Sequence, residues 1–160
     1  ILLMSVNPGF PGQKFIEGVF KSCNYFLKNG FKLIIITNQS GIGRGYYQEK
    51  DFYLLNQWMH DQFERHGITI LETFFCPHLP EQDCNCRKPK PGLIKKASQK
   101  YNIDLKNSWM IGDKEVDIKA ANSAGISNTI LVQTGHKIDE SKTNAKYVLK
   151  SINETVQIIN

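Results

Sequence analysis

Residues 37–45 combine a hydroxyl, an amide and several glycines, directly after the apolar run 33–36. Side-chain donors at the end of a strand, together with backbone N–H groups in glycine-rich turns, can hold a phosphate group. A polar loop that needs glycines only for its turns is the alternative interpretation. The hydroxyl of Thr37, placed at the end of the predicted strand, favours a phosphate site. The candidate phosphate-binding residues are Thr37, Asn38, Gln39 and Ser40.

Three of the four cysteines stand close to a histidine within residues 76–86. The four candidate metal ligands are Cys76, His78, Cys84 and Cys86. Thiolates and an imidazole form tetrahedral Zn²⁺ sites, whereas cysteines separated by one residue rarely pair as a disulfide. Reduced cysteines without a metal are the alternative, and the ligand types and spacing favour zinc. Such a closed site would hold a proline-rich loop that cannot pack a core of its own.

Two cations, Arg87 and Lys88, follow the last of these cysteines. A guanidinium can grip an anion with a two-pronged fork, and an ammonium acts as a point charge. Two exposed surface charges are the alternative. Their position beside the candidate zinc site favours a clamp for an anion.

An acidic residue, Asp113, follows a further predicted strand. A carboxylate at the carboxyl end of a strand can hold Mg²⁺, and Asp117, one helical turn later, could support it. The alternative is that Asp113 caps the following helix and that Asp117 lies on a solvated helix face.

Apolar spacing along the chain predicts alternating helices and strands. Helices are predicted over 15–27, 52–63, 93–101, 116–124 and 151–159, and strands over 31–37, 70–75, 108–111, 129–132 and 145–149. Residues 38–46 and 76–91 are predicted to be loops. This alternation predicts an α/β fold with a mostly parallel sheet covered by helices on both faces. Ligands of such sheets bind at the carboxyl ends of the strands, where Thr37, Cys76 and Asp113 stand.

Length and composition indicate one globular domain that is not embedded in a membrane. The 160 residues are 41% hydrophobic and 22% charged, with a net charge of +5, and they can bury a core. No apolar run approaches the ~18 residues of a membrane span, and no signal peptide pattern is visible. Together with the cysteine usage, this predicts a cytoplasmic protein. The lysines are spread along the chain, so their charge suits anionic substrates without distinguishing a phosphosugar from nucleic acid.

The motifs taken together resemble a known superfamily. Thr37, the run Arg87-Lys88-Pro89 and Gly112-Asp113 with Asp117 are similar to the second, third and fourth motifs of haloacid dehalogenase (HAD) phosphatases. Residues 37–45 with 76–89 resemble the D-glycero-D-manno-heptose 1,7-bisphosphate 7-phosphatases in particular, and the histidinol-phosphate phosphatases share the zinc pattern. The resemblance covers residues 15–160 and implies a single HAD-like domain, a Rossmannoid three-layer sandwich.

The resemblance also implies roles for the residues. Residues 37–40 would bind the transferring phosphoryl group, Arg87 would recognise the substrate, and Lys88 would neutralise charge during catalysis. Asp113, with the backbone of Lys114, would ligate Mg²⁺, and the cysteine and histidine cluster would hold zinc. The family reaction is hydrolysis through an aspartyl-phosphate. The expected ligand is a small phosphorylated sugar, with no nucleic-acid or membrane partner and a monomeric protein.

One departure from the superfamily bears directly on activity. HAD phosphatases open with a strand ending in Asp-x-Asp-Gly, whose first Asp is the nucleophile and whose second is the general acid and base. No Asp occurs here before Asp51. Residues 4–15 instead resemble the phosphate-binding loop of ribulose-phosphate 3-epimerase, a (β/α)₈ barrel enzyme. Residues 1–15 are therefore interpreted as an epimerase-like segment joined to the HAD-like domain.

The apolar residues 1–6 have the length of a strand. In the superfamily the first strand lies in the middle of the sheet, and its loss would leave unpaired backbone groups that cost ~1–3 kcal/mol each when buried. We therefore expect residues 1–6 to fill the central position. Asn7 or Pro8 would then stand near the place of the nucleophile, where neither can replace a carboxylate.

Three functions follow from these observations. The first is removal of the 7-phosphate of D-glycero-D-manno-heptose 1,7-bisphosphate, a step towards ADP-heptose and the lipopolysaccharide core, with activity impaired for lack of the nucleophile. The second is histidinol-phosphate hydrolysis, which the five-residue gap between His78 and Cys84 permits, although residues 40–45 favour the heptose group. The third is a non-catalytic module that binds a phosphosugar through the remaining residues.

Overall fold

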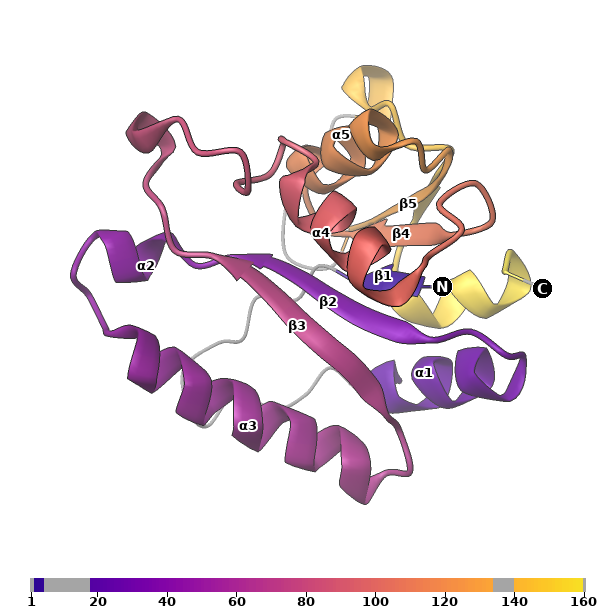
Figure 1. Ribbon diagram of the computed structural model, residues 1–160. Coiled ribbons are helices and arrows are strands. Elements are labelled where there is room, and N and C mark those ends of the chain that lie inside the picture. The colour runs from indigo at the N-terminus through magenta and orange to yellow at the C-terminus, as the bar shows by residue number, and fades with distance from the viewer. Residues whose placement is uncertain (1, 5–17, 134–139, 160) are drawn as a thin grey trace.

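The computed structural model describes residues 2–4, 18–133 and 140–159, which form one layered α/β unit (Figure 1). Among these residues, six parallel strands make one sheet in the order β3-β2-β1-β4-β5-β6. The strands are β1 (Leu2–Met4), β2 (Leu33–Asn38), β3 (Ile70–Cys76), β4 (Trp109–Gly112), β5 (Asn128–Val132) and β6 (Tyr147–Leu149). The expected parallel sheet is therefore confirmed.

Strand β1 occupies the middle of the sheet. Leu3 pairs with Ile34 of β2 on one side and with Met110 of β4 on the other. The expectation that the N-terminal apolar segment fills the central position is confirmed for residues 2–4. Asn7 and Pro8, the residues expected near the place of the nucleophile, lie outside the described residues.

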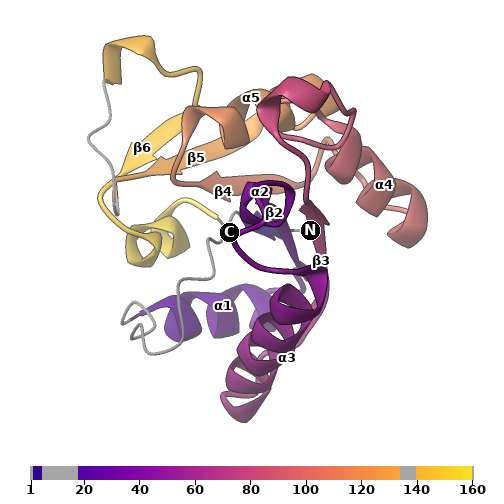
Figure 2. The same ribbon diagram turned by 90° about the vertical axis from the view of Figure 1, so that its left-hand side faces the viewer.

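Helices cover both faces of the sheet, as Figures 1 and 2 show. Helices α1 (Val19–Lys28) and α3 (Glu49–Arg65) and the 3₁₀ helix η3 (Ile152–Gln157) lie on one face, and α4 (Gly92–Tyr101) and α5 (Glu115–Ala124) lie on the other. Each face buries its own apolar cluster. The three-layer arrangement predicted from the sequence is confirmed.

Strand β2 explains why the two clusters form on opposite faces. Residues 33–36 are fully buried, and alternate side chains of a strand point to opposite faces. Ile35 packs with Phe26 and Phe63 on the α1 and α3 side, whereas Ile34 and Ile36 belong to the cluster on the α4 and α5 side. A continuous apolar run rich in isoleucine thus suits a strand buried between two helical layers.

Two expectations about local structure are wrong. The predicted loop over residues 38–46 contains a single helical turn, α2 (Ser40–Gly43), because the N–H of Gly43 donates to the carbonyl of Pro77 at 3.0 Å and helps to hold the turn. The predicted last helix is the 3₁₀ helix η3 instead of an α-helix. Trp58 is 44% exposed although it is apolar, because it precedes the inward-facing Met59 by one position on α3.

The strand order reverses direction at β1, between β2 and β4. In open parallel sheets, ligands bind outside the carboxyl ends of the strands at such a switch point. Thr37 and Asn38 at the end of β2 and Asp113 after β4 therefore stand at the edge where a ligand is expected. Of the helices in the described ranges, none is both long and apolar enough to cross a lipid bilayer.

The central position of β1 can be tested through its backbone. Replacing Leu3 with Pro removes one backbone N–H from the strand, whereas Leu3→Ala keeps it. We expect Leu3→Pro to lower the free energy of unfolding by about 1–3 kcal/mol more than Leu3→Ala does, because a buried hydrogen-bond partner is left unpaired. Urea denaturation followed by circular dichroism measures the difference. Equal unfolding midpoints for the two variants would contradict the central placement.

Candidate functional site

A buried ion pair between Lys88 and Asp117 lies at the centre of the candidate site. The ammonium Nζ of Lys88 is 2.7 Å from Oδ1 of Asp117, and it also donates to the backbone carbonyl of Ile36 at 2.7 Å. Lys88 is 4% exposed and Asp117 is 1% exposed. The interpretation of Asp117 as a residue of a solvated helix face is therefore wrong. Its carboxylate instead holds the cation of the candidate anion clamp.

Asn38 fixes the backbone on which this cation stands. The side-chain Nδ2 of Asn38 donates to the carbonyl of Lys88 at 3.1 Å, and the N–H of Lys88 donates to Oδ1 of Asn38 at 3.1 Å. This reciprocal pair uses both polar atoms of the amide. Asn38, predicted as a phosphate ligand, thus joins the end of β2 to the loop that carries Lys88.

The start of α5 holds the carboxylate of Asp117 in place. The N–H of Lys114 donates to Oδ2 of Asp117 at 3.1 Å, and the N–H of Asp117 donates to the carbonyl of Lys114 at 2.9 Å. Gly112 leaves the room for this arrangement, since a Cβ there would lie 2.4 Å from Cβ and 2.7 Å from Oδ2 of Asp117. The Gly-Asp-x-x-x-Asp pattern therefore describes a tight approach of strand and helix.

Burial and two neighbouring carboxylates shift the pKa of Lys88 in opposite directions. Burial lowers the pKa of Lys88 below its ordinary value, and the charges of Asp117 and Asp113 partly offset that effect. The half-buried Asp113 thus lies close enough for its charge to act on Lys88. The region therefore combines one buried cation with two acidic groups.

Thr37 takes part in a second set of hydrogen bonds at the end of β2. Nε2 of Gln39 donates to Oγ1 of Thr37 at 2.9 Å, and the hydroxyl of Tyr47 donates to Oε1 of Gln39 at 2.6 Å. Thr37 and Gln39 are 3% and 5% exposed. Gln39, predicted as a phosphate ligand, thus contacts the hydroxyl of Thr37. Ser40 begins the turn α2.

The four candidate zinc ligands converge. The Sγ atoms of Cys76, Cys84 and Cys86 and a ring nitrogen of His78 all lie within 4.8 Å of one another. The sulfur–sulfur distances are 3.1, 3.4 and 3.5 Å. A tetrahedral Zn²⁺ with bonds of ~2.3 Å would separate its sulfurs by about 3.8 Å, only slightly more. The donor set and its geometry therefore fit a zinc ion.

The thiols of this cluster shift one another's pKa values. Burial, with the hydrogen bond to Cys86, raises the pKa of Cys76 to about 12. Burial also acts to raise the pKa of Cys84, but hydrogen bonds from Cys86 and from the backbone N–H of Arg87 outweigh it and lower that pKa to about 7. Three thiolates this close repel each other unless a cation lies between them. Metal binding at the cluster would therefore release protons.

Backbone contacts join the cluster to the glycine-rich segment and to Arg87. The N–H of Gln39 donates to the carbonyl of Cys76 at 2.7 Å. The guanidinium of Arg87 donates to the carbonyl of His78 at 3.2 Å, which holds a half-buried cation close to the cluster loop. The cluster, the phosphate-binding candidates and the anion clamp are thus parts of one connected edge of the sheet.

The structure brings most of the predicted site residues to this one edge, and their chemical roles stay predictions. Thr37, Lys88 and Asp113 stand at the carboxyl ends of the central strands or beside them. Lys114, predicted to ligate Mg²⁺ through its backbone, uses that carbonyl in the first turn of α5. Sequence reasoning missed Tyr47, since no local pattern links it to Gln39 eight residues earlier.

Comparison with family models finds two matches. Residues 85–155 match the HAD-hydrolase-like model, and residues 1–36 match that of the ribulose-phosphate 3-epimerase family. The second match extends beyond the first fifteen residues, so the expected extent of that resemblance is too short. Residues 1–36 include β1, α1 and most of β2.

Curated relatives with high identity are heptose bisphosphate phosphatases. The D-glycero-alpha-D-manno-heptose-1,7-bisphosphate 7-phosphatase of Photorhabdus laumondii is 48% identical over 123 residues, which cover 72% of this chain and 67% of that protein. The D-glycero-beta-D-manno-heptose-1,7-bisphosphate 7-phosphatase of Haemophilus ducreyi is 41% identical over 169 residues, 98% of this chain and 93% of that protein. The relatives thus include enzymes named for either anomer.

Solved structures share the fold. A D,D-heptose 1,7-bisphosphate phosphatase from B. bronchiseptica, complexed with magnesium and phosphate, superposes with a TM-score of 0.81 at 24% identity, covering 98% of this chain and 96% of that one. The D,D-heptose 1,7-bisphosphate phosphatase from Burkholderia thailandensis gives a TM-score of 0.70 at 18% identity. The HAD-like Rossmannoid fold predicted from the sequence is confirmed.

The buried ion pair generates a prediction about stability. Lys88→Met keeps the length of the side chain but leaves the carboxylate of Asp117 buried without its cation. We expect this variant to lose about 3–5 kcal/mol of unfolding free energy, since breaking a buried pair from one side is strongly destabilising. Chemical denaturation measures the loss.

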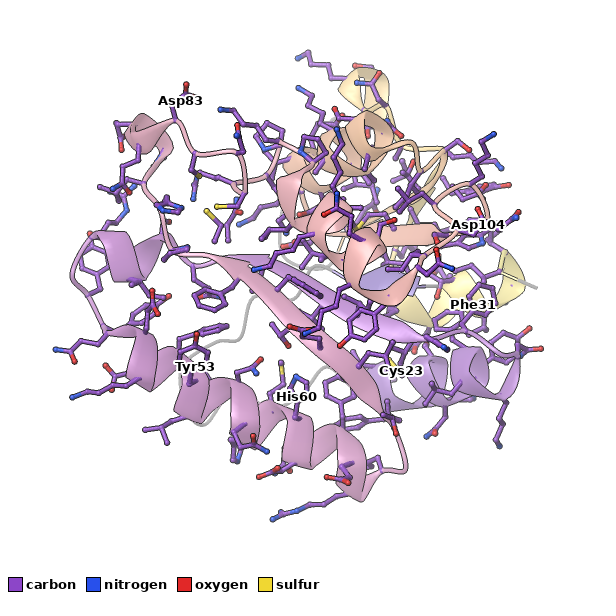
Figure 3. All side chains as sticks on the ribbon, in the orientation of Figure 1. Cys23, Phe31, Tyr53, His60, Asp83 and Asp104 are labelled. Carbon is purple, nitrogen blue, oxygen red and sulfur yellow. The ribbon has the colours of Figure 1, made fainter. Side chains whose placement is uncertain are left out.

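Lys90→Met is the matched control. Lys90 stands two residues away and pairs with Asp83, whose side chain is 91% exposed at the outer part of the loop (Figure 3). Solvent screens such exposed pairs, so the control should lose much less stability than Lys88→Met. Similar losses for the two variants would contradict the importance of the buried pair.

Proposed function

Because the chain belongs to the family of HAD-like hydrolases that contains the D-glycero-D-manno-heptose 1,7-bisphosphate 7-phosphatases, we propose that it binds a phosphorylated heptose of this class at the edge formed by Thr37, Arg87 and Lys88. The observation that carries the proposal is the buried ammonium of Lys88, held beside the end of β2 by Asn38, Asp117 and Ile36. A fixed cation and a buried hydroxyl that are both held at the end of β2 are suited to a phosphate dianion.

Thr37, Lys88 and Arg87 would each make a different contact with the ligand. The hydroxyl of Thr37 would donate to a phosphate oxygen, and the ammonium of Lys88 would neutralise its charge. The guanidinium of Arg87, held by the carbonyl of His78, would contact the sugar or its second phosphate. Water would remain outside the deepest part of the site, because Thr37 and Lys88 are buried. Electrostatic attraction is stronger in such a region of low polarity.

We further propose that hydrolysis by this chain is severely impaired. The family reaction needs a carboxylate at the end of the first strand, and no Asp precedes Asp51. Among the described residues, Asp117 already pairs with Lys88, and Asp113 follows β4 rather than β1. The chain would therefore hold a phosphosugar without transferring its phosphoryl group to the protein.

Mg²⁺ and Zn²⁺ would have different roles in this protein. A bound Mg²⁺ would supply positive charge to the phosphate oxygens, with Asp113 and the backbone of Lys114 as ligands. One carboxylate binds Mg²⁺ weakly, so tight binding would need a second carboxylate on the first strand. The cluster of Cys76, His78, Cys84 and Cys86 fits a structural Zn²⁺ that holds the loop before Arg87. A monomeric, cytoplasmic protein stays a prediction.

Restoring the missing carboxylates tests the proposal. The double variant Ser5→Asp with Asn7→Asp creates an Asp-x-Asp spacing shortly after β1. We expect phosphate release from heptose 1,7-bisphosphate to rise at least about 10³-fold over the chain as it stands, because loss of a nucleophile costs that much or more. Both anomers and histidinol phosphate belong in the substrate panel, with released phosphate as the readout.

Two further measurements make this test decisive. Adding Lys88→Met to the restored variant should abolish the gain, which separates family chemistry from a contaminating phosphatase. Calorimetry with the chain as it stands should detect binding of heptose 1,7-bisphosphate without phosphate release. Rapid turnover by the unaltered chain would refute the proposed impairment, and absence of sugar binding would refute the proposed function.

The zinc site can be tested by metal content and stability. We expect about one zinc per chain by mass spectrometry of the metal, and its loss in Cys84→Ser. The control Cys23→Ala removes the cysteine on α1 that lies outside the cluster and should keep the zinc. Chelation should lower the melting temperature by roughly 5–10 °C, because the loop depends on the metal. A chain that purifies without zinc at full stability would contradict the site.

A further inference from the structure

Three buried or half-buried side chains form a chain of hydrogen bonds that ends at the candidate phosphate site. The hydroxyl of Tyr47 lies 2.6 Å from Oε1 of Gln39, and Nε2 of Gln39 lies 2.9 Å from Oγ1 of Thr37. The segment is anchored, since the N–H of Gln39 donates to the carbonyl of Cys76 at 2.7 Å. These contacts link a tyrosine outside the predicted site to the hydroxyl that is expected to meet phosphate.

The ring of Tyr47 fits the surface of α2 closely. A Cβ at Gly41 would lie 2.2 Å from Cε1 and 2.9 Å from the hydroxyl oxygen of Tyr47. Gly41 therefore leaves the space in which the ring reaches Gln39. Burial raises the pKa of Tyr47 above its ordinary value. The glycine-rich segment thus shapes a support for Gln39 in addition to its turn.

The direction of these hydrogen bonds matters because each group has limited donors. An amide NH₂ only donates, so Oγ1 of Thr37 accepts from Gln39 and its own proton can point to another acceptor. If the amide were reversed, its oxygen would accept the proton of Thr37. The dianion of a phosphate monoester offers acceptors and no donor, and the unprotonated oxygens of inorganic phosphate likewise only accept. Binding phosphate therefore requires every bond in the chain to point from Tyr47 towards the ligand.

We propose that Tyr47 and Gln39 are positioning residues, which act through Thr37 to hold its hydroxyl proton available to a phosphate oxygen. The inference rests on the proposed function, because it assigns the phosphate to Thr37. Each donated bond polarises the next one in the same direction, so the tyrosine strengthens a contact that it does not itself make.

Inorganic phosphate is the probe, and the full chain with its metal is the protein tested. Tyr47→Phe keeps the ring and removes the donor, so we expect about 3–10-fold weaker phosphate binding by calorimetry, the effect of one hydrogen bond. Tyr46→Phe is the matched control, because this neighbouring tyrosine is 77% exposed; its affinity should equal that of the unaltered chain.

Gln39→Glu tests the direction of the hydrogen bonds. An ionised carboxylate of the same shape still accepts from Tyr47 but cannot donate to Thr37, so it captures the threonine proton. We expect phosphate affinity to fall about 30-fold or more, also because the new charge repels phosphate. Thermal denaturation of each variant shows whether it remains folded.

A nuclear magnetic resonance signal separates positioning from a purely structural role. With ¹⁵N-labelled glutamine, the side-chain NH₂ resonances of Gln39, assigned by their loss in Gln39→Leu, should shift downfield when phosphate binds. The shift should be smaller in Tyr47→Phe and unchanged in Tyr46→Phe. A role confined to folding would leave this difference absent.

The outcomes distinguish the inference from the proposed function. If the unaltered chain binds phosphate and Tyr47→Phe and Gln39→Glu bind it equally well, the positioning role is overturned while the proposed function stands. If the unaltered chain binds neither phosphate nor the sugar bisphosphate, both are overturned. Graded losses in the two variants, with an unchanged Tyr46→Phe, would support the inference.

Discussion

The ammonium of Lys88 joins three segments of the chain that are far apart in sequence. The ammonium contacts the carbonyl of Ile36 in β2 and the carboxylate of Asp117 at the start of α5, and the backbone of its own loop pairs with the side chain of Asn38 at the end of β2. A cation taken out of water is costly unless oxygen atoms surround it, and these contacts supply them. The position of the loop that follows the cysteine cluster therefore depends on charge compensation at the carboxyl ends of the strands rather than on apolar packing.

This dependence explains why the candidate zinc site and the phosphate-binding candidates belong together. Cys76 belongs to the core on the α4 and α5 side, Cys84 and Cys86 pack against it only partly buried, and backbone hydrogen bonds from Gln39 and Gly43 fix the beginning of the cluster loop. Its end carries Arg87 and Lys88, whose directions matter for an anion. A metal ion between the two ends would stiffen the intervening residues without needing a core. In this arrangement the two ends of one loop serve a single ligand site.

The sequence predicted the layers of the fold and the composition of the site better than the contacts within it. The fully apolar run 33–36 indicated a buried strand, and the cysteine spacing indicated which ligand atoms converge. Asn38 and Gln39 were predicted to contact phosphate because they follow a strand, yet their side chains bind Lys88 and Thr37. The partner of Asn38 lies fifty residues away, so no local pattern could reveal it. The turn α2 was missed because glycines disfavour helices and tertiary contacts override that preference.

Strand β1 shows that the architecture of a fold and its activity depend on different parts of a segment. Backbone pairing between parallel strands involves N–H and C=O groups that every residue except proline provides. An apolar segment of suitable length can therefore complete a sheet whatever its ancestry, while reactive side chains are inherited only with the particular segment that bears them. Superposition with related enzymes shows that the architecture is shared. It does not show whether the reactive side chains are present. For proteins of this architecture, the few residues that follow the innermost strand are the better guide to whether turnover survives.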